Sequence, residues 1–200
     1  MSEGKKISLS SKFIILFIMI GAFVLVSNIL ISYFNLKSLS SKLIESLYLE
    51  KLQGDINAAR LYLKDHHGSL TLSENKLIDK DGKSIENDFK LVDKIKNELG
   101  IVATIFIKDG NDFRRISTNI KKENGDRAVG TMLGVNSAAY RPVKESELYI
   151  GKANILGKNY FTAYDPILDR SGNTIGILFI GIETNKANRI GITFINKVTK

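Results

Sequence analysis

The pattern of apolar and polar positions divides the chain into an apolar run, an amphipathic segment and a series of short β-like runs. The apolar run extends from Phe13 to Phe34, and no charged residue occurs between Lys12 and Lys37. A helix of this length spans about 33 Å, the thickness of the hydrocarbon layer of a membrane. A cleaved signal peptide would have a shorter apolar core followed by a small-residue cleavage site, which the sequence lacks. We therefore predict an uncleaved transmembrane helix over residues 13–34.

The distribution of positive charge predicts the orientation of this helix. Lys5, Lys6 and Lys12 flank its N-terminal end, and acidic residues beyond it count for little in the positive-inside rule. The bias favours a cytoplasmic N-terminus over residues 1–12 and an extracytoplasmic remainder. No second run of membrane length follows, because the apolar stretch 175–182 is far too short. We therefore expect a single-pass protein of the inner membrane, in contact with membrane lipid.

An amphipathic segment follows the apolar run. Its apolar residues recur at helical spacing, and charged residues fill the intervening positions. The apolar positions are Leu36, Leu39, Leu43, Leu47, Tyr48, Leu52, Ile56, Ala59 and Leu63. We predict a helix of about 28 residues that continues the membrane helix and ends near Gly68. A stripe this regular is typical of a packing surface, either against a partner helix or against the protein's own domain.

The rest of the chain predicts one short helix and then a sheet. The helix runs from Phe89 to Leu99, with Asn87-Asp88 as its cap and Gly100 as its stop. Short runs rich in β-branched and aromatic residues follow, separated by turn signals that contain glycine and asparagine. The expected strands are 101–107, 113–120, 149–156, 160–167 and 174–182. Because most connections are too short for crossover helices, we predict an α+β fold with a five-stranded antiparallel sheet.

Two smaller features complete this prediction. The sequence Lys80-Asp81-Gly82-Lys83 is able to turn a small hairpin, and residues 136–147 interrupt the strands. We expect a short helix around 138–140 in this insertion, limited by Pro142. The two longer helices are expected to cover one face of the sheet, while the insertion and the loops close over a pocket on the other.

The composition excludes several kinds of chemistry. The 200 residues include no cysteine, so a disulfide, a thiolate metal site and a cysteine nucleophile are impossible. The formal net charge is +8, but the lysines are scattered, and we expect no nucleic-acid binding. The only histidines, His66 and His67, point about 100° apart on a helix, so we expect neither a metal site nor a cofactor. No serine-nucleophile motif or catalytic carboxylate pair stands out, and we expect no enzyme activity.

Several short motifs resemble a known family when they are taken together and in order. They are Thr104-Ile-Phe, Asp112-Phe-x-Arg-x-Ser-Thr-Asn, Arg127-Ala-Val-Gly-Thr, Gly157-x-x-Tyr160-Phe-Thr, Tyr164-x-Pro-Ile and Gly176-Ile-Leu-Phe-x-Gly. This set resembles the single Cache sensor domain of bacterial methyl-accepting chemotaxis receptors and sensor kinases.

The resemblance implies a PAS-like fold, in which a long N-terminal helix leads into an antiparallel sheet that binds a small extracellular molecule. Ligands in the wider group are commonly small carboxylates, amino acids and similar metabolites, and dimers form through the long helix. We assign the sensor domain to residues 35–183 and a polar tail to 184–200. Family receptors continue into a second membrane helix and a signalling module, and neither follows Glu183 here. We therefore expect a protein that lacks its output module, as a truncated receptor or as a stand-alone unit.

The candidate ligand-binding residues are those that suit an anionic solute. An arginine offers two parallel charge-assisted hydrogen bonds to a carboxylate, and the candidates are Arg115 and Arg127. Strand alternation places Arg115 on one face with Phe113, Ser117 and Asn119, and Thr118 on the other.

Tyrosine and threonine side chains supply further candidates. Tyr160, Thr162 and Tyr164 share one face of their strand, and Thr118 and Thr131 are weaker candidates. The sequence thus predicts a membrane-anchored sensor that binds a small carboxylate or other anion for chemotaxis or signal transduction. The alternative is a structural or interaction module that binds no ligand and dimerises with an intact receptor. That alternative predicts a pocket filled by the protein's own side chains.

Overall fold

A computed structural model describes residues 8–185, so residues 1–7 and most of the expected tail 184–200 lie outside the described residues. Contacts divide the chain into two units, 1–43 and 44–200. The helix α1 (Leu9–His67) contributes to both units and includes both helical segments that the sequence predicts.

The first unit consists of the apolar part of α1. Its large hydrophobic side chains are exposed, and its most apolar window has a mean hydropathy of 2.9 with none of it buried. By length and composition, this helix is long and apolar enough to cross a membrane.

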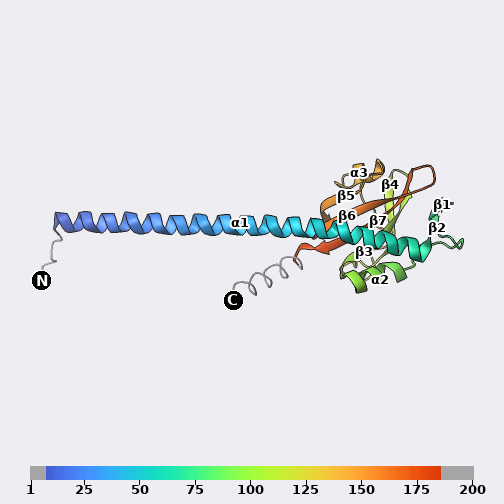
Figure 1. The fold of residues 1–200 in the computed structure, drawn as a ribbon, viewed down its shortest axis with the longest axis horizontal. Helices are drawn as coiled ribbons and strands as arrows, with labels where there is room; N and C mark the ends of the chain where they lie inside the picture. The colour runs from blue at the N-terminus through green and yellow to red at the C-terminus, as the bar shows by residue number, and fades with distance from the viewer. Residues whose placement is uncertain (1–7, 186–200) are drawn as a thin grey trace. The chain divides into compact units, whose positions relative to one another are not determined.

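The second unit is built on a five-stranded sheet whose neighbouring strands are all antiparallel, in the order β4-β3-β7-β6-β5 (Figure 1). The strands are β3 (Val102–Asp109), β4 (Asp112–Thr118), β5 (Tyr149–Ile155), β6 (Lys158–Leu168) and β7 (Thr174–Glu183). All five agree with the predicted strands to within two residues at every end. The α+β prediction is confirmed.

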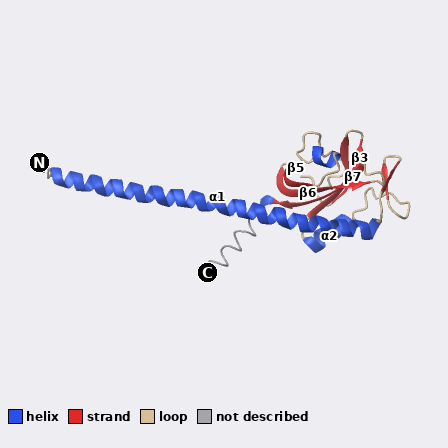
Figure 2. Cartoon of the chain, turned by 45° about the horizontal axis from the view of Figure 1, so that its top comes forward, coloured by secondary structure: helices blue, strands red, loops and turns tan. Residues whose placement is uncertain are grey.

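Helices cover one face of this sheet (Figure 2). The C-terminal part of α1 and the helix α2 (Lys90–Leu99) bury their apolar stripes against alternate residues of β3 and β7. The core on this face includes Leu52, Ile56, Ala59, Leu63, Leu91, Val92, Ile95, Ala103, Ile105, Leu178 and Ile180. The amphipathic stripe of α1 therefore packs against the protein's own domain from Leu52 onward.

Loops and the short helix α3 (Tyr140–Lys144) cover the opposite face of the sheet. The core on this face is more aromatic and includes Phe106, Phe113, Val143, Tyr160, Tyr164, Ile177 and Phe179. Because β7 carries apolar residues toward both faces, nearly all of its side chains are buried.

Three local details differ from the sequence predictions. The first is an additional hairpin, between β1 (Thr71–Ser73) and β2 (Lys76–Ile78), just before the expected turn. The expected turn itself forms, because residues 79–83 reverse the chain and Ile78 and Ser84 pair across it in an isolated antiparallel bridge. The helix α3 begins at Tyr140 and tolerates Pro142, because residues in the first helical turn need no N–H partner.

The third difference is the start of α2. Its N-cap is Phe89, with no capping bond from that side chain, and the Asp88 carboxylate accepts a hydrogen bond from the Lys90 amide at 3.1 Å. Gly100 ends the helix in the left-handed conformation, as predicted.

A β-bulge in β4 makes part of the predicted face assignment wrong. Phe106 pairs with Arg115 and Ile105 pairs with Ser117, which leaves Ile116 without an opposite residue. A bulge shifts the alternation by one residue, so Ser117 and Asn119 move to the helix-covered face. There Ser117 donates a hydrogen bond to the Asp88 carbonyl. Arg115 stays on the face opposite the helices, and Thr118 joins that face.

The packing of α1 on the sheet predicts a large difference between two of its positions. Ile56 is fully buried, whereas Leu61 is 67% exposed on the same helix. We expect Ile56→Ala to lower the free energy of unfolding by about 2–4 kcal/mol, because it removes apolar contacts and leaves a cavity. Leu61→Ala is the control and should change it by less than about 0.5 kcal/mol. Chemical denaturation of the full chain in detergent micelles measures both values, and equal effects would contradict this packing.

Candidate functional site

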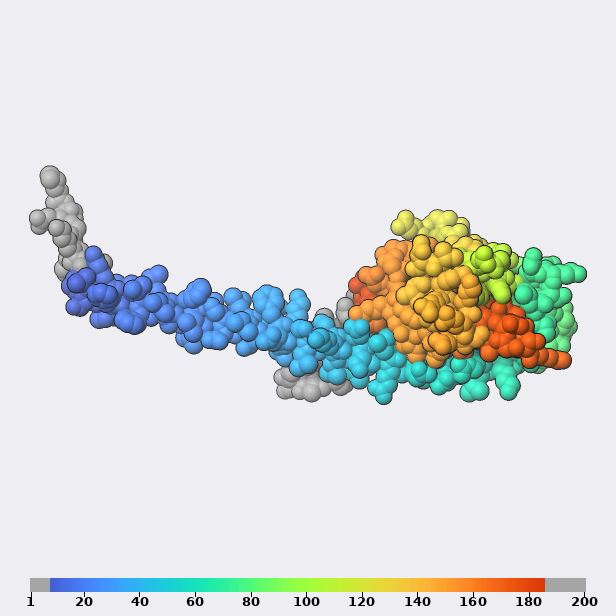
Figure 3. Space-filling view, turned by 90° about the horizontal axis from the view of Figure 1, so that it is seen from above, coloured from blue at the N-terminus to red at the C-terminus, as the bar shows by residue number. Residues whose placement is uncertain are grey.

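A cavity of about 680 Å³ lies on the face of the sheet opposite the helices. Its floor comes from β4, β5 and β6, and its cover is the segment 131–139. In the space-filling view, the yellow-to-orange segments that follow β4 form much of the surface on this side of the domain (Figure 3). Arg115, Tyr149 and Tyr164 contribute polar groups to the lining, together with Asp112 and Thr131. A volume of this size suits a small organic molecule.

Arg115 is a buried cation in the wall of this cavity, with only 4% of its surface exposed. One terminal nitrogen donates a hydrogen bond to the Thr131 hydroxyl, and the guanidinium lies 4.9 Å from the centre of the Phe106 ring. Its Nε has no hydrogen-bond partner. Within residues 8–185, no carboxylate forms an ion pair with Arg115.

Other arginines of the domain do have carboxylate partners. Arg114, the next residue, bonds Glu86 at 2.6 Å and Asp109 at 3.0 Å. Arg60 pairs with Asp165 at 2.7 Å. A charge that is taken out of water is normally paired, because desolvation is costly. Arg115 is therefore a buried cation that has no carboxylate partner among the described residues.

Burial lowers the pKa of Arg115 to about 10, with small opposing effects from Tyr164 and Tyr160. The group is still protonated at pH 7, so the folded protein holds a positive charge in the cavity wall. Relative to the ordinary pKa, this lowering corresponds to a cost of about 3 kcal/mol for keeping the charge. Because the folded-state pKa lies below the ordinary one, the cost is fully present below about pH 10 and is lost as pH rises beyond it.

The backbone around Arg115 explains how the side chain is held. β4 is an edge strand, and the segment 130–133 lies along its free edge. The Arg115 amide donates to the Thr131 carbonyl at 2.9 Å, and the Arg115 carbonyl accepts from the Gly130 amide at 2.8 Å. This pairing supplies hydrogen-bond partners to the backbone groups at the edge of the sheet, and it places the Thr131 hydroxyl beside the guanidinium.

Two tyrosines lie in the cavity wall on the β5–β6 side. Burial raises the pKa of Tyr164, so its hydroxyl stays neutral and is able to donate a hydrogen bond. The Tyr149 ring is 6.0 Å from the Tyr164 ring and lies against Gly151. A Cβ atom at position 151 would come within 2.4 Å of the Tyr149 hydroxyl oxygen, so glycine is what allows this ring position.

A comparison with family models identifies the domain. Residues 43–191 match the Cache 3/Cache 2 fusion domain, which covers more than half of the chain. The chain belongs to this Cache family. Cache sensor domains bind ligands outside the cytoplasm, and the resemblance seen in the sequence motifs is confirmed.

One solved structure that the chain is similar to is the ligand-binding domain of the Campylobacter jejuni chemoreceptor Tlp3, in complex with L-valine. The two share 12% sequence identity, with a TM-score of 0.46 over 75% of this chain. The match spans 59% of the length of that domain. No curated protein gives a significant match to the chain.

The Cache domain brings together some of the predicted site residues. Arg115, Tyr164 and Thr131 line the same cavity. Tyr160 belongs to the buried core on this face but does not line the cavity. Thr162 is fully buried, and its hydroxyl donates to the Gly151 carbonyl at 2.9 Å.

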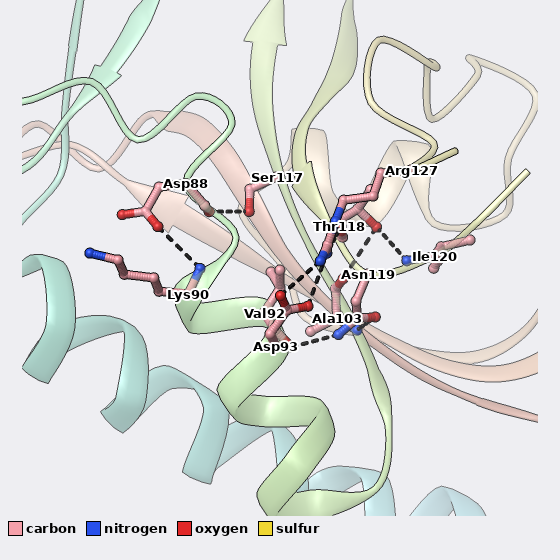
Figure 4. Close-up of polar contacts among 10 residues, drawn as sticks. All are labelled: Asp88, Lys90, Val92, Asp93, Ala103, Ser117, Thr118, Asn119, Ile120 and Arg127. Atoms are coloured by element: carbon pink, nitrogen blue, oxygen red, sulfur yellow. Dashed lines mark hydrogen bonds and ion pairs between the residues drawn. The ribbon is translucent and has the colours of Figure 1, made fainter. Parts of the chain in front are cut away.

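Thr118 and Arg127 lie in another polar cluster, next to α2 (Figure 4). The hydroxyl groups of Thr118 and Thr104 form a hydrogen bond of 2.6 Å. Arg127 donates two hydrogen bonds to Asp93, at 2.9 and 2.7 Å, and one to the Thr118 carbonyl at 2.7 Å. Its guanidinium also lies 4.3 Å from the centre of the Phe89 ring. Arg127 thus has its own counter-charge and does not share the cavity with Arg115.

Sequence reasoning missed Asp112, Tyr149 and most of the cover segment. Asp112 accepts hydrogen bonds from the amides of Phe113, at 2.7 Å, and Gly134, at 3.2 Å, and the second of these bonds ties the cover to the start of β4. The motif that begins at Asp112 marked this residue as unusual. Its role as a hydrogen-bond acceptor depends on residue 134 folding back to meet it, which the sequence does not show. Tyr149 opens a strand and carries no motif.

The contrast between the two arginines predicts opposite effects on the stability of the Cache domain. Arg115→Met removes an unpaired buried charge, so we expect the ligand-free protein to be equally stable or more stable. Arg127→Met removes a paired charge and leaves the Thr118 carbonyl without its donor, which should cost about 1–2 kcal/mol. Thermal unfolding of the full chain without added solutes measures both. A loss larger for Arg115→Met than for Arg127→Met would contradict our account of Arg115.

Proposed function

We propose that this Cache domain senses a small carboxylate or other small anion, which binds in the cavity against Arg115. The observation that carries the proposal is a buried, protonated guanidinium that faces a cavity and has no carboxylate partner in the described chain. A bound carboxylate supplies the missing charge and accepts charge-assisted hydrogen bonds from the guanidinium. The neutral Tyr164 hydroxyl offers a further donor from the cavity wall.

The negative charge of Asp112 restricts the ligand further. Its carboxylate lines the same cavity, and its described partners are two backbone amides rather than a cation. A second negative charge on the ligand would be desolvated in the presence of this carboxylate. The cavity therefore favours ligands with one carboxylate over dicarboxylates of similar size.

Binding to a panel of solutes tests the proposal directly. Isothermal titration of the full chain in micelles with monocarboxylates, dicarboxylates and amino acids should yield at least one binder with a single free carboxylate. Arg115→Met should weaken that binding at least 30-fold, because a desolvated charge-assisted pair is lost. Arg115→Lys should weaken it less, since the charge is kept without the bidentate geometry.

Arg127→Met provides the matched control for this titration. It removes an arginine of the same domain that lies outside the cavity, and it should leave the affinity within about threefold, provided the variant is folded. Binders whose affinity is the same in the wild type and in Arg115→Met would disprove the anion site.

We further propose that the domain is anchored by residues 13–34 of α1, with a cytoplasmic N-terminus and a sensor domain over 35–183. The exposed apolar run of α1 and the lysines before it support this topology. In this arrangement the domain acts as a binding module rather than an enzyme. A ligand that prefers one arrangement of sheet and helix would shift the population, and α1 would carry the difference toward the membrane.

Two copies are proposed to associate through α1. Leu36, Leu39, Leu43 and Leu47 are all more than half exposed, although they continue the stripe that is buried from Leu52 onward. Leucines at this three- and four-residue spacing form a seam for a second helix. The described residues offer this seam no partner within the chain.

Cysteine cross-linking tests this dimer without interference, because the chain has no cysteine of its own. A single Leu43→Cys substitution should give a disulfide-linked dimer in membranes under mild oxidation. Ser41→Cys, on the other side of the helix, is the control and should cross-link much more slowly. Equal rates for the two variants would indicate random collision instead of a defined interface.

The alternative function, an interaction module without a ligand, predicts a pocket filled by the protein's own side chains. A cavity of about 680 Å³ beside an unpaired arginine favours the sensor instead.

A further inference from the structure

Two histidines at the end of α1 lie against the segment that leads into α2, away from the ligand cavity. His66, His67 and Asp88 each place one potential metal-ligand atom within 4.8 Å of the other two. None of these three residues lines the cavity. His67 and Asp88 are 21 positions apart in the sequence, so no local motif predicts the cluster.

His67 is the residue that makes this cluster unusual. It is 2% exposed, and its Nε2 has no hydrogen-bond partner. In residues 8–185, the only other buried side-chain nitrogen or oxygen without a partner is Nε of Arg115. An unpaired buried polar atom is costly, so each such atom calls for an explanation. The anion cavity accounts for Arg115, whereas nothing in that cavity accounts for His67.

The surroundings of His67 suit a metal ligand. The Asp79 carboxylate lies 3.9 Å from Nδ1 of His67. Its other oxygen accepts hydrogen bonds from the amides of Asp81, at 3.0 Å, and Lys83, at 2.8 Å. A carboxylate beside one ring nitrogen, with the second nitrogen open, is the usual setting of a metal-bound histidine.

The helical geometry of the pair does not prevent both histidines from reaching one ion. The expectation against a metal site rested on the 100° between successive helical residues, but the rings of His66 and His67 lie 4.6 Å apart between centroids. α1 ends at His67, and His66 is exposed, so its ring is able to turn toward an ion.

Asp88 is held near the pair by its own backbone. Its carbonyl accepts a 2.6 Å hydrogen bond from Ser117, and one carboxylate oxygen bonds the Lys90 amide (Figure 4). The ligand set of two imidazoles and one carboxylate suits zinc and related transition metals, whereas magnesium and calcium prefer oxygen ligands alone.

We propose that His66, His67 and Asp88 bind a divalent transition-metal ion of the zinc type, with water as a fourth ligand. The ion ties the end of α1 to the start of α2, the two helices that cover one face of the sheet. The site is separate from the anion cavity and does not depend on the proposed function.

Metal binding to the full chain, purified in micelles without a histidine tag and treated with chelator, tests this proposal. Zn²⁺ should raise the unfolding temperature, and Mg²⁺ at the same concentration should not. Because the chain has only two histidines, ¹⁵N-histidine NMR resolves them, and the ring nitrogens of both should shift with Zn²⁺.

Ligand substitutions at the accessible residues complete the test. His66→Ala and Asp88→Asn should each weaken Zn²⁺ binding at least tenfold, while Asp65→Asn, a neighbouring exposed carboxylate, should not change it. These three positions are exposed or half-buried, so circular dichroism should show that the variants are folded. A substitution of His67 is not used, because a change at this buried position could unfold the domain. Absence of a Zn²⁺ response, or an equal affinity in all three variants, would overturn the proposal.

Discussion

The central constraint on this fold is that β3 and β7 are apolar on both faces. A sheet with two apolar faces must be covered on both, and the chain covers them with unlike material. Two helices with regular apolar stripes cover one face, where packing is dense and aliphatic. The other face is covered by α3 and by the segment 131–139, which bridge a more aromatic surface. Loops cannot fill space as helices do, and the cavity lies beneath this thinner cover.

The position of Arg115 follows from the same arrangement. β4 is at the edge of the sheet, and the segment that satisfies this edge also forms part of the cavity cover. The backbone pairing of β4 with residues 130–133 therefore covers the edge of the sheet, holds the cover in place and encloses the guanidinium in protein. The charge is desolvated with no carboxylate partner among the described residues, at a cost to stability that the proposed anionic ligand would offset.

Among the described residues, two buried side-chain atoms lack a hydrogen-bond partner. Nε of Arg115 belongs to a strand of the sheet and lies on the cavity side, whereas Nε2 of His67 belongs to the end of α1, a helix that covers the other face. α1 is also the helix whose N-terminal part is apolar enough to cross a membrane. A ligand on one face and a metal ion on the other would act on different contacts of the same domain. The metal site would stiffen the junction of α1 and α2, and the ligand would act through the sheet.

The sequence alone determined the membrane-length helix, its amphipathic continuation and the five strands, because these depend on periodicity and local composition. The Cache resemblance came from short motifs that occur together and in order. It also singled out Arg115 and Tyr164, which belong to recognisable strand motifs and which the structure places in the cavity wall. The structure alone decided that Arg127 pairs with Asp93, because that contact joins residues 34 positions apart. Likewise, the bulge at Ile116 reversed the predicted faces of Ser117 and Thr118. One extra residue in a strand inverts the alternation of the residues after it, and the local sequence does not reveal that extra residue. The meeting of His67 with Asp88 is of the same kind, for only the packing of α2 beside α1 brings them together.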